Sequence, residues 1–181
     1  MKPATALLAI ACLAAAPPAR AAGLTGSSVT LEGFGGWQNL DVHAPASSIA
    51  GAVSGTEGTA IVGGDVLGKL GLFGLGLSLD KTVSGSVQPW AGSVMLGLLL
   101  DVLPSLRLEA LGEAGRHGSS FGDMFGSSGR TFLGLRPGVS FRLLPTPVRF
   151  GVTALVRWPT SGSDPGSPSY GFVGKVGLEL P

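Results

Sequence analysis

Cysteine is almost missing from this chain of 181 residues. The single cysteine is Cys12, close to the amino terminus. If the first residues are removed on export, the mature chain has no cysteine, which excludes disulfides and cysteine-ligated metals. Histidine is also scarce, because His43 and His117 are the only two. The composition therefore argues against a zinc site built from cysteine or histidine, and we expect no cofactor.

Residues 1–21 have the pattern of a secretory signal peptide. Lys2 supplies the positive charge, residues 4–16 form an apolar core, and Ala19-Arg20-Ala21 has the form of a cleavage site. The alternative is lipoprotein processing at Cys12, because Ile10-Ala11-Cys12 resembles the end of a lipobox. We expect a signal peptide over residues 1–21 and a single domain over residues 22–181.

Charge is sparse and long hydrophobic runs are lacking. Charged residues make up 13% of the chain, and the net charge of +1 gives no sign of a nucleic-acid partner. No stretch has the length of about 20 uncharged apolar residues that a membrane-spanning helix needs. Hydrophobic residues nevertheless make up 44% of the chain, which is too apolar for a disordered protein.

The stretch Gly129–Leu144 shows how this apolar material is arranged. Its three arginines, Arg130, Arg136 and Arg142, are six residues apart. On a β-strand, where side chains alternate between two faces, all three point the same way. The opposite face carries no charge. One charged face and one apolar face predict a transmembrane strand that turns its apolar side to lipid and its charges to the inside of a small barrel.

Eight segments alternate in this way and predict an all-β fold, an eight-stranded antiparallel up-and-down transmembrane β-barrel. The segments are 28–42, 58–68, 70–82, 87–102, 106–117, 129–144, 147–159 and 168–180. The breaks at Gly68-Lys69, Leu103-Pro104-Ser105 and Pro145-Thr146-Pro147 are tight, and the others are mostly longer. Short turns at one end and longer loops at the other are typical of bacterial outer-membrane barrels, so we expect an outer-membrane location with the loops outside.

Two further patterns support this prediction. Amphipathic aromatic rings favour the membrane interface, and the predicted lipid-facing aromatic residues gather at the two strand ends. They are Trp37, Trp90, Trp158 and Tyr170 at the loop end, and Phe73, Phe141 and Phe150 at the turn end. The inner faces collect equal numbers of both charges, as a closed, ion-paired interior requires. The predicted interior network is Glu32, Asp65, Asp80, Asp101, Arg107, Glu109, Glu113, Arg130, Arg136, Arg142, Arg149, Arg157, Lys175 and Glu179.

A soluble periplasmic β-barrel with its aliphatic side chains inward would show the same alternation. Its water-facing side would normally carry many lysines, whereas the charged faces here contain only Lys175. It also gives no reason for tryptophan and tyrosine to gather at one end of the strands.

In strand pattern, length and loop asymmetry the chain resembles the small eight-stranded outer-membrane barrels of the OmpA and OmpX type. The resemblance implies a packed interior and a role as an envelope anchor or an adhesion or resistance factor. It also implies lipopolysaccharide and the barrel-assembly machinery as partners. The chain departs from that family at its end, because it finishes Leu180-Pro181 where the family commonly has an aromatic residue.

We expect a non-enzymatic protein that acts through its outer loops on an unknown extracellular ligand. A narrow pore and a lipid A-modifying enzyme are the alternatives. The second rests on His117 and Ser119, which repeat the His-x-Ser spacing of lipid A deacylases without the glutamate that should follow. Lys81 and Arg116, on the lipid-facing side near the loops, are candidate contacts for lipopolysaccharide phosphates.

Overall fold

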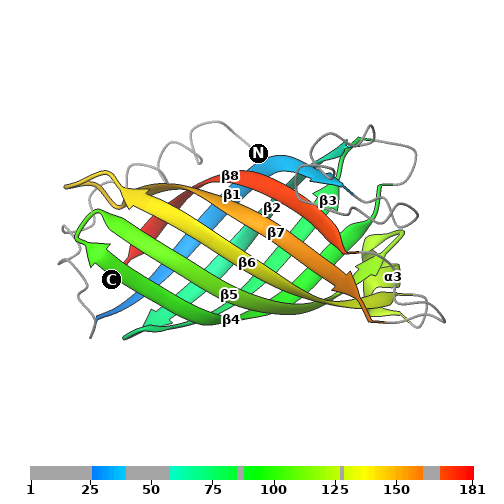
Figure 1. Ribbon diagram of the computed structural model, residues 1–181, viewed down its shortest axis with the longest axis horizontal. Helices are drawn as coiled ribbons and strands as arrows, with labels where there is room; N and C mark the ends of the chain where they lie inside the picture. The colour runs from blue at the N-terminus through cyan, green and yellow to red at the C-terminus, as the bar shows by residue number, and fades with distance from the viewer. Residues whose placement is uncertain (1–25, 40–57, 85–87, 127–128, 161–167) are drawn as a thin grey trace, which may run out of the picture.

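The computed structural model describes residues 26–39, 58–84, 88–126, 129–160 and 168–181. Eight strands form one closed barrel, each pairing antiparallel with its neighbours in the chain, and β1 pairs with β8 to close it (Figure 1). The strands are β1 (Ser27–Asn39), β2 (Gly58–Leu70), β3 (Phe73–Thr82), β4 (Trp90–Leu103), β5 (Leu106–Gly118), β6 (Arg130–Arg142), β7 (Val148–Pro159) and β8 (Ser169–Leu180). The predicted eight-stranded antiparallel fold is confirmed. The predicted signal peptide, Cys12 and His43 lie outside the described residues.

Burial follows the two-residue period that predicted the strands. In β3 and β8, exposed and buried side chains alternate along almost the whole strand. Successive side chains of a pleated strand point to opposite faces, so one set enters the barrel and the other covers its outside. The register therefore fixes which residues meet inside.

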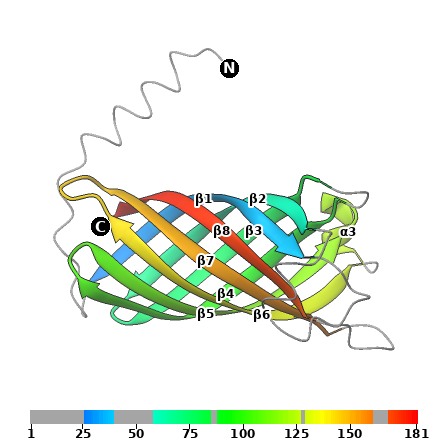
Figure 2. The same cartoon turned by 45° about the horizontal axis from the view of Figure 1, so that its top comes forward.

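The three hairpin turns lie together at one end of the barrel, beside the carboxyl terminus (Figure 2). The predicted turn at Gly68-Lys69 is wrong. Strand β2 continues to Leu70, and the chain reverses at Gly71, whose φ of 62° favours glycine over any residue with a side chain. Extending β2 carries Lys69 into the barrel, where it is buried.

The connection between β5 and β6 contains a helix that the sequence pattern did not predict. Helix α3 spans Phe121–Phe125 at the loop end, next to the outer ends of β4 and β5 (Figures 1 and 2). Ser120 caps it by accepting a hydrogen bond from the Asp123 amide. Among the described residues, no helix is long and apolar enough to cross a membrane.

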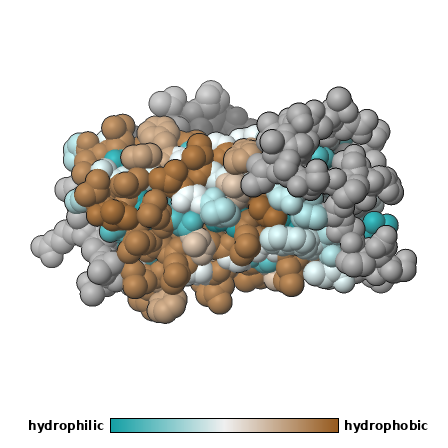
Figure 3. Space-filling model, in the orientation of Figure 1, coloured by the Kyte–Doolittle hydropathy of each residue, from teal (hydrophilic) through white to brown (hydrophobic). Residues whose placement is uncertain are grey.

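The barrel has its charged residues inside and its aliphatic residues outside. Among the described residues, buried apolar side chains of the interior form two small clusters, Phe34, Ile61, Leu155 and Val173, and Leu67, Met95, Leu99 and Leu111. The outer wall exposes leucine, valine and phenylalanine from all eight strands. Figure 3 shows apolar side chains covering the turn end of the visible face, with apolar and paler residues mixed from the middle toward the loops.

Candidate functional site

The interior of the barrel is the most unusual part of the molecule, because it holds ion pairs where a soluble domain holds aliphatic side chains. The structure places every predicted network residue there except Arg130. Arg107, Arg136 and Arg157 are each no more than 2% exposed. Buried charges are tolerated only when they are paired and hydrogen-bonded, and the pairs form three groups along the barrel axis.

The group nearest the turns is centred on Glu179 of β8. Arg149 Nη2 donates to Glu179 Oε2 at 2.7 Å, Arg107 donates to Oε1, and Arg142 Nη1 lies 3.7 Å from Oε2. Ser28 of β1 adds a hydrogen bond of 2.9 Å to Oε1. One carboxylate of the last strand therefore joins β1, β5, β6 and β7.

Asp101 of β4 extends this group to the opposite wall. It accepts from Arg107 Nε at 2.7 Å and also pairs with Lys69 of β2. Because Arg107 contacts both acids, Lys69, Asp101, Arg107 and Glu179 form one continuous chain of charges across the barrel. This chain fills the interior just above the turns.

The middle group crosses the barrel in two directions. Arg136 of β6 donates from both terminal nitrogens to Asp65 of β2, at 2.8 and 3.3 Å, and to the Ser78 hydroxyl at 2.9 Å. Lys175 of β8 donates to Glu32 at 2.9 Å and to Glu109 at 2.5 Å. A guanidinium that binds a carboxylate with two parallel hydrogen bonds is a geometrically specific contact. The Arg136–Asp65 and Lys175–Glu109 pairs join strands that are not neighbours in the barrel, whereas Lys175–Glu32 joins the adjacent strands β8 and β1.

The group nearest the loops is a clamp on Arg157 of β7. Its Nε donates to Glu113 at 2.7 Å and its Nη2 donates to Asp80 at 2.7 Å. The guanidinium carbon also lies 4.8 Å from the Phe132 ring centroid, within the range of a cation–π contact. Arg157 thus holds β3, β5 and β7 together at the upper end of the interior.

The prediction is wrong for two basic residues, one placed inside that lies outside and one placed in a turn that lies inside. Arg130 shares the inward parity of β6 but is exposed at the outer strand end, beyond the packed interior. Lys69 was assigned to a turn and instead lies inside. The correction leaves seven basic and seven acidic side chains in the described interior. The basic ones are Lys69, Arg107, Arg136, Arg142, Arg149, Arg157 and Lys175, and the acidic ones are Glu32, Asp65, Asp80, Asp101, Glu109, Glu113 and Glu179.

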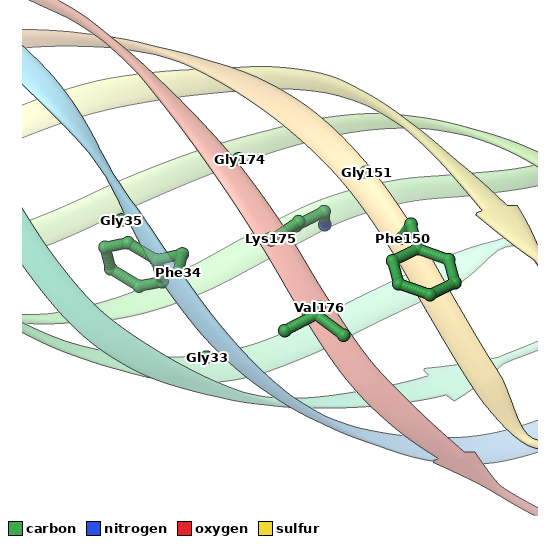
Figure 4. Close-up of a pocket in the computed structure, with 8 residues that line it drawn as sticks. All are labelled: Gly33, Phe34, Gly35, Phe150, Gly151, Gly174, Lys175 and Val176. Atoms are coloured by element: carbon green, nitrogen blue, oxygen red, sulfur yellow. The ribbon is translucent and has the colours of Figure 1, made fainter.

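A groove on the outer wall spans β1, β7 and β8 (Figure 4). The outward-facing glycines Gly33, Gly35 and Gly174 line it, and Phe150 and Val176 flank it. Lys175 also borders it, but its ammonium binds the interior acids Glu32 and Glu109. The groove therefore opens to the surroundings of the barrel and has no charged group of its own.

The predicted aromatic residues lie on the outer wall at the two strand ends. Phe141 and Phe150 sit opposite each other on β6 and β7, at the turn end, and each is about half exposed. Phe73, at the start of β3, is 65% exposed. Trp37, Trp90, Trp158 and Tyr170 lie at the loop ends of their strands and are partly exposed.

The two predicted lipopolysaccharide contacts have different surroundings. Lys81 is partly exposed, and its ammonium lies 5.2 Å from the Trp90 ring centroid. Arg116 instead donates from Nη2 to the carbonyls of Gly126 and Gly129, at 2.6 and 3.1 Å. Its guanidinium therefore holds the β5–β6 connection in place, and this end of the side chain is engaged within the protein.

The His-x-Ser pair has no catalytic arrangement. The imidazole of His117 packs on Phe132, with ring centroids 4.4 Å apart, and no hydrogen bond joins it to Ser119 within the described residues. The Ser119 hydroxyl donates to Asp123 at 2.5 Å, and this bond lowers the pKa of the Asp123 carboxyl. A nucleophilic serine needs a base within hydrogen-bond reach, and here the Ser119 hydroxyl is bonded to the Asp123 carboxylate instead.

No protein-family model matches this chain, and no curated protein matches it. Among solved structures, the N-terminal β-barrel domain of Pseudomonas aeruginosa OprF aligns with a TM-score of 0.55 and 15% identity, over 84% of this chain and 97% of that one. Ail, the attachment invasion locus protein of Yersinia pestis, aligns with a TM-score of 0.50 and 18% identity, over 86% of this chain and 99% of that one. The chain has the fold of the small outer-membrane β-barrels. At this identity the likeness concerns the fold alone.

Proposed function

We propose that this chain is an outer-membrane β-barrel protein with a packed, ion-paired interior, a non-enzymatic envelope component that acts through its extracellular loops. The observation that carries the proposal is the reversed distribution of polarity. Aliphatic side chains such as Leu96, 63% exposed, cover the outside, while guanidinium groups are buried inside. Water would disfavour such a wall, whereas lipid would favour it, and a closed barrel leaves no strand edge unpaired in lipid.

The arrangement of turns and termini supports an orientation. The described ends of the chain, residue 26 and Pro181, lie at the same end as the tight turns. A chain exported to the periplasm and inserted from there would keep its turns and termini on the periplasmic side, with the longer loops outside. We further propose that the barrel-assembly machinery inserts it.

Site-directed labelling tests the lipid-facing wall. Leu135 of β6 is 52% exposed on the outer face, and Ser140 of the same strand is fully buried inside. In membranes, a cysteine at Leu135 should resist water-soluble thiol reagents, and a fluorophore attached there in detergent should be quenched after reconstitution by nitroxide-bearing lipids. Ser140→Cys is the matched control. Its buried thiol should react neither with the water-soluble reagent nor with the fluorophore. Rapid labelling of Leu135→Cys by the water-soluble reagent alone, together with recovery as a soluble periplasmic protein, would contradict the membrane assignment.

A conductance measurement separates this proposal from the narrow-pore alternative. Eight strands enclose a space just wide enough for side chains to fill, and Arg136 occupies its middle through its bonds to Asp65 and Ser78. Purified protein in planar bilayers should therefore show no large, stable current. Arg136→Ala, which removes the largest central side chain, should leak more than the wild type. A steady porin-sized current from the wild type would mean that the charged interior lines water.

A further inference from the structure

Helix α3 lies on the outside of the barrel wall, where β4 begins and β5 ends. Its one buried side chain, Met124, is 3% exposed and packs over Gly92 and Gly118, which both lie on the outward face. A Cβ atom at Gly92 would sit 2.8 Å from the Met124 sulfur, and one at Gly118 would sit 2.3 Å from the Met124 amide nitrogen. The helix can dock this closely only because neither position carries a side chain.

Polar contacts fix the helix in this position from both ends. The Ser120 hydroxyl accepts from the Asp123 amide at the start of α3. Arg116, on the outward face of β5, donates to the Gly126 carbonyl just beyond its end. The connection is therefore folded back against the wall by side chains of its own strand and loop.

This docking leaves two large apolar rings exposed. Phe121 is 50% exposed and Phe125 is 70% exposed. Phe121 makes edge-to-face contacts with Trp90, at 5.6 Å between ring centroids, and with Phe125, at 5.4 Å. The Lys81 ammonium lies over the Trp90 ring, 5.2 Å from the ring centroid. We name these four residues, Lys81, Trp90, Phe121 and Phe125, the rim patch.

We propose that the rim patch binds the outer leaflet of the membrane, with its rings at the boundary between acyl chains and headgroups and Lys81 on a lipid phosphate. This inference rests on the proposed function. The patch continues the apolar wall, because Trp90 shares the outward face of β4 with the exposed Val94 and Leu96. Aromatic rings favour the interfacial layer, and an ammonium beside them complements an anionic lipid. The β5–β6 connection is then a lateral membrane contact, and extracellular ligands are left to the other loops.

Fluorescence quenching in vesicles tests the position of the patch. The environment-sensitive dye NBD would be attached to Phe125→Cys, in a mature chain without Cys12, and the protein refolded into phosphatidylcholine vesicles containing phosphatidylglycerol. Arg130→Cys is the matched control, because this residue is exposed at the other end of the same connection with inward parity. We expect lipids with a nitroxide near the headgroup to quench the dye at 125 several-fold more than at 130. Aqueous iodide should show the reverse order.

A third probe keeps this test separate from the test of the membrane assignment. NBD at Leu135→Cys reports the mid-strand wall, so lipid quenching at 135 without lipid quenching at 125 would overturn the rim proposal alone. Loss of lipid quenching at both positions would instead overturn the proposed function. A dye at 125 that is shielded from lipid and iodide together, with protein cross-linking that rises with concentration, would mean that a second copy covers the patch and would also overturn the proposal.

Lys81→Gln tests the charge component. If the ammonium meets lipid phosphate, adding phosphatidylglycerol to phosphatidylcholine vesicles should increase headgroup quenching at position 125 in the wild-type background. In Lys81→Gln the increase should be lost, while quenching at 135 stays unchanged. An equal response of both proteins to the anionic lipid would show that Lys81 makes no phosphate contact.

Discussion

Replacing Arg157 with alanine should lower the free energy of unfolding by about 3–5 kcal/mol, the cost of breaking a buried ion pair by removing one partner. Arg157 is 1% exposed and contacts both Asp80 and Glu113 at 2.7 Å. Its loss removes the cation that Asp80 and Glu113 share, and the remaining contact from Arg136 Nη1 to Glu113 is long, at 4.0 Å. The measurement is denaturant unfolding of the refolded barrel, followed by heat-modifiable gel mobility.

Two comparisons make this result specific to the ion pairs. Arg130→Ala removes an arginine that is exposed at the outer strand end, so it should change the free energy of unfolding by less than about 0.5 kcal/mol. Adding Asp80→Asn and Glu113→Gln to Arg157→Ala should recover part of the loss, because the uncompensated charges then disappear. If Arg157→Ala unfolds like the wild type, water must solvate the two acids and the upper interior is not dry.

Strand parity is a strong constraint on which side chains of a strand face the interior. A shift of one residue would turn every charged side chain of a strand to the other face. Arg107, Glu109 and Glu113 of β5 therefore had to enter the barrel together once the apolar face was assigned outward. The partners of each charge do not follow from parity. The pairing of Arg136 with Asp65 joins strands β6 and β2 across the interior, and only the stagger of the closed barrel sets which residues share a level.

The two errors of assignment share a cause. Gly68-Lys69 has the composition of a turn, but the chain reverses at Gly71, where the backbone has a positive φ. Local composition does not locate a turn to within two residues, and the shift decides whether Lys69 faces water or lies inside. Arg130 has the right parity but lies beyond the level where the opposite walls meet. Parity gives the direction of a side chain, and its height along the barrel decides its burial.

The sequence does not predict the rim patch, for a different reason. Helix α3 is only five residues long and has no helical repeat of apolar residues. The stretch that contains Phe121, Met124 and Phe125 is rich in glycine and serine and gives no sequence signal for a helix. The signal that could have revealed the contact is the pair of outward glycines, Gly92 and Gly118, in neighbouring strands and two residues apart in register. Together they leave room for a segment to pack on the wall.

The second large effect is expected at Glu179, near the carboxyl end of β8. Glu179→Ala should cost about 3–5 kcal/mol of unfolding free energy, because Arg107, Arg142 and Arg149 would lose the carboxylate that they share. The position has a further consequence, since β8 closes the barrel against β1. Glu179 makes contacts to four other strands, β1, β5, β6 and β7, that form only when the last strand is in place. Its loss should therefore slow barrel closure as well as weaken the closed state.

Ser28→Ala is the control for this closure. It removes one hydrogen bond, from the Ser28 hydroxyl of β1 to the Glu179 carboxylate, and leaves the three arginines in place. The expected cost is about 1.5–3 kcal/mol, below that of Glu179→Ala. Refolding into vesicles, followed by the appearance of the heat-modifiable band over time, reports the rate, and denaturant unfolding reports the stability. Glu179→Ala should lose several-fold in rate relative to Ser28→Ala. Equal rates and stabilities for the two variants would mean that solvent screens the turn-end arginines, and that closure depends on the backbone pairing of β1 with β8 alone.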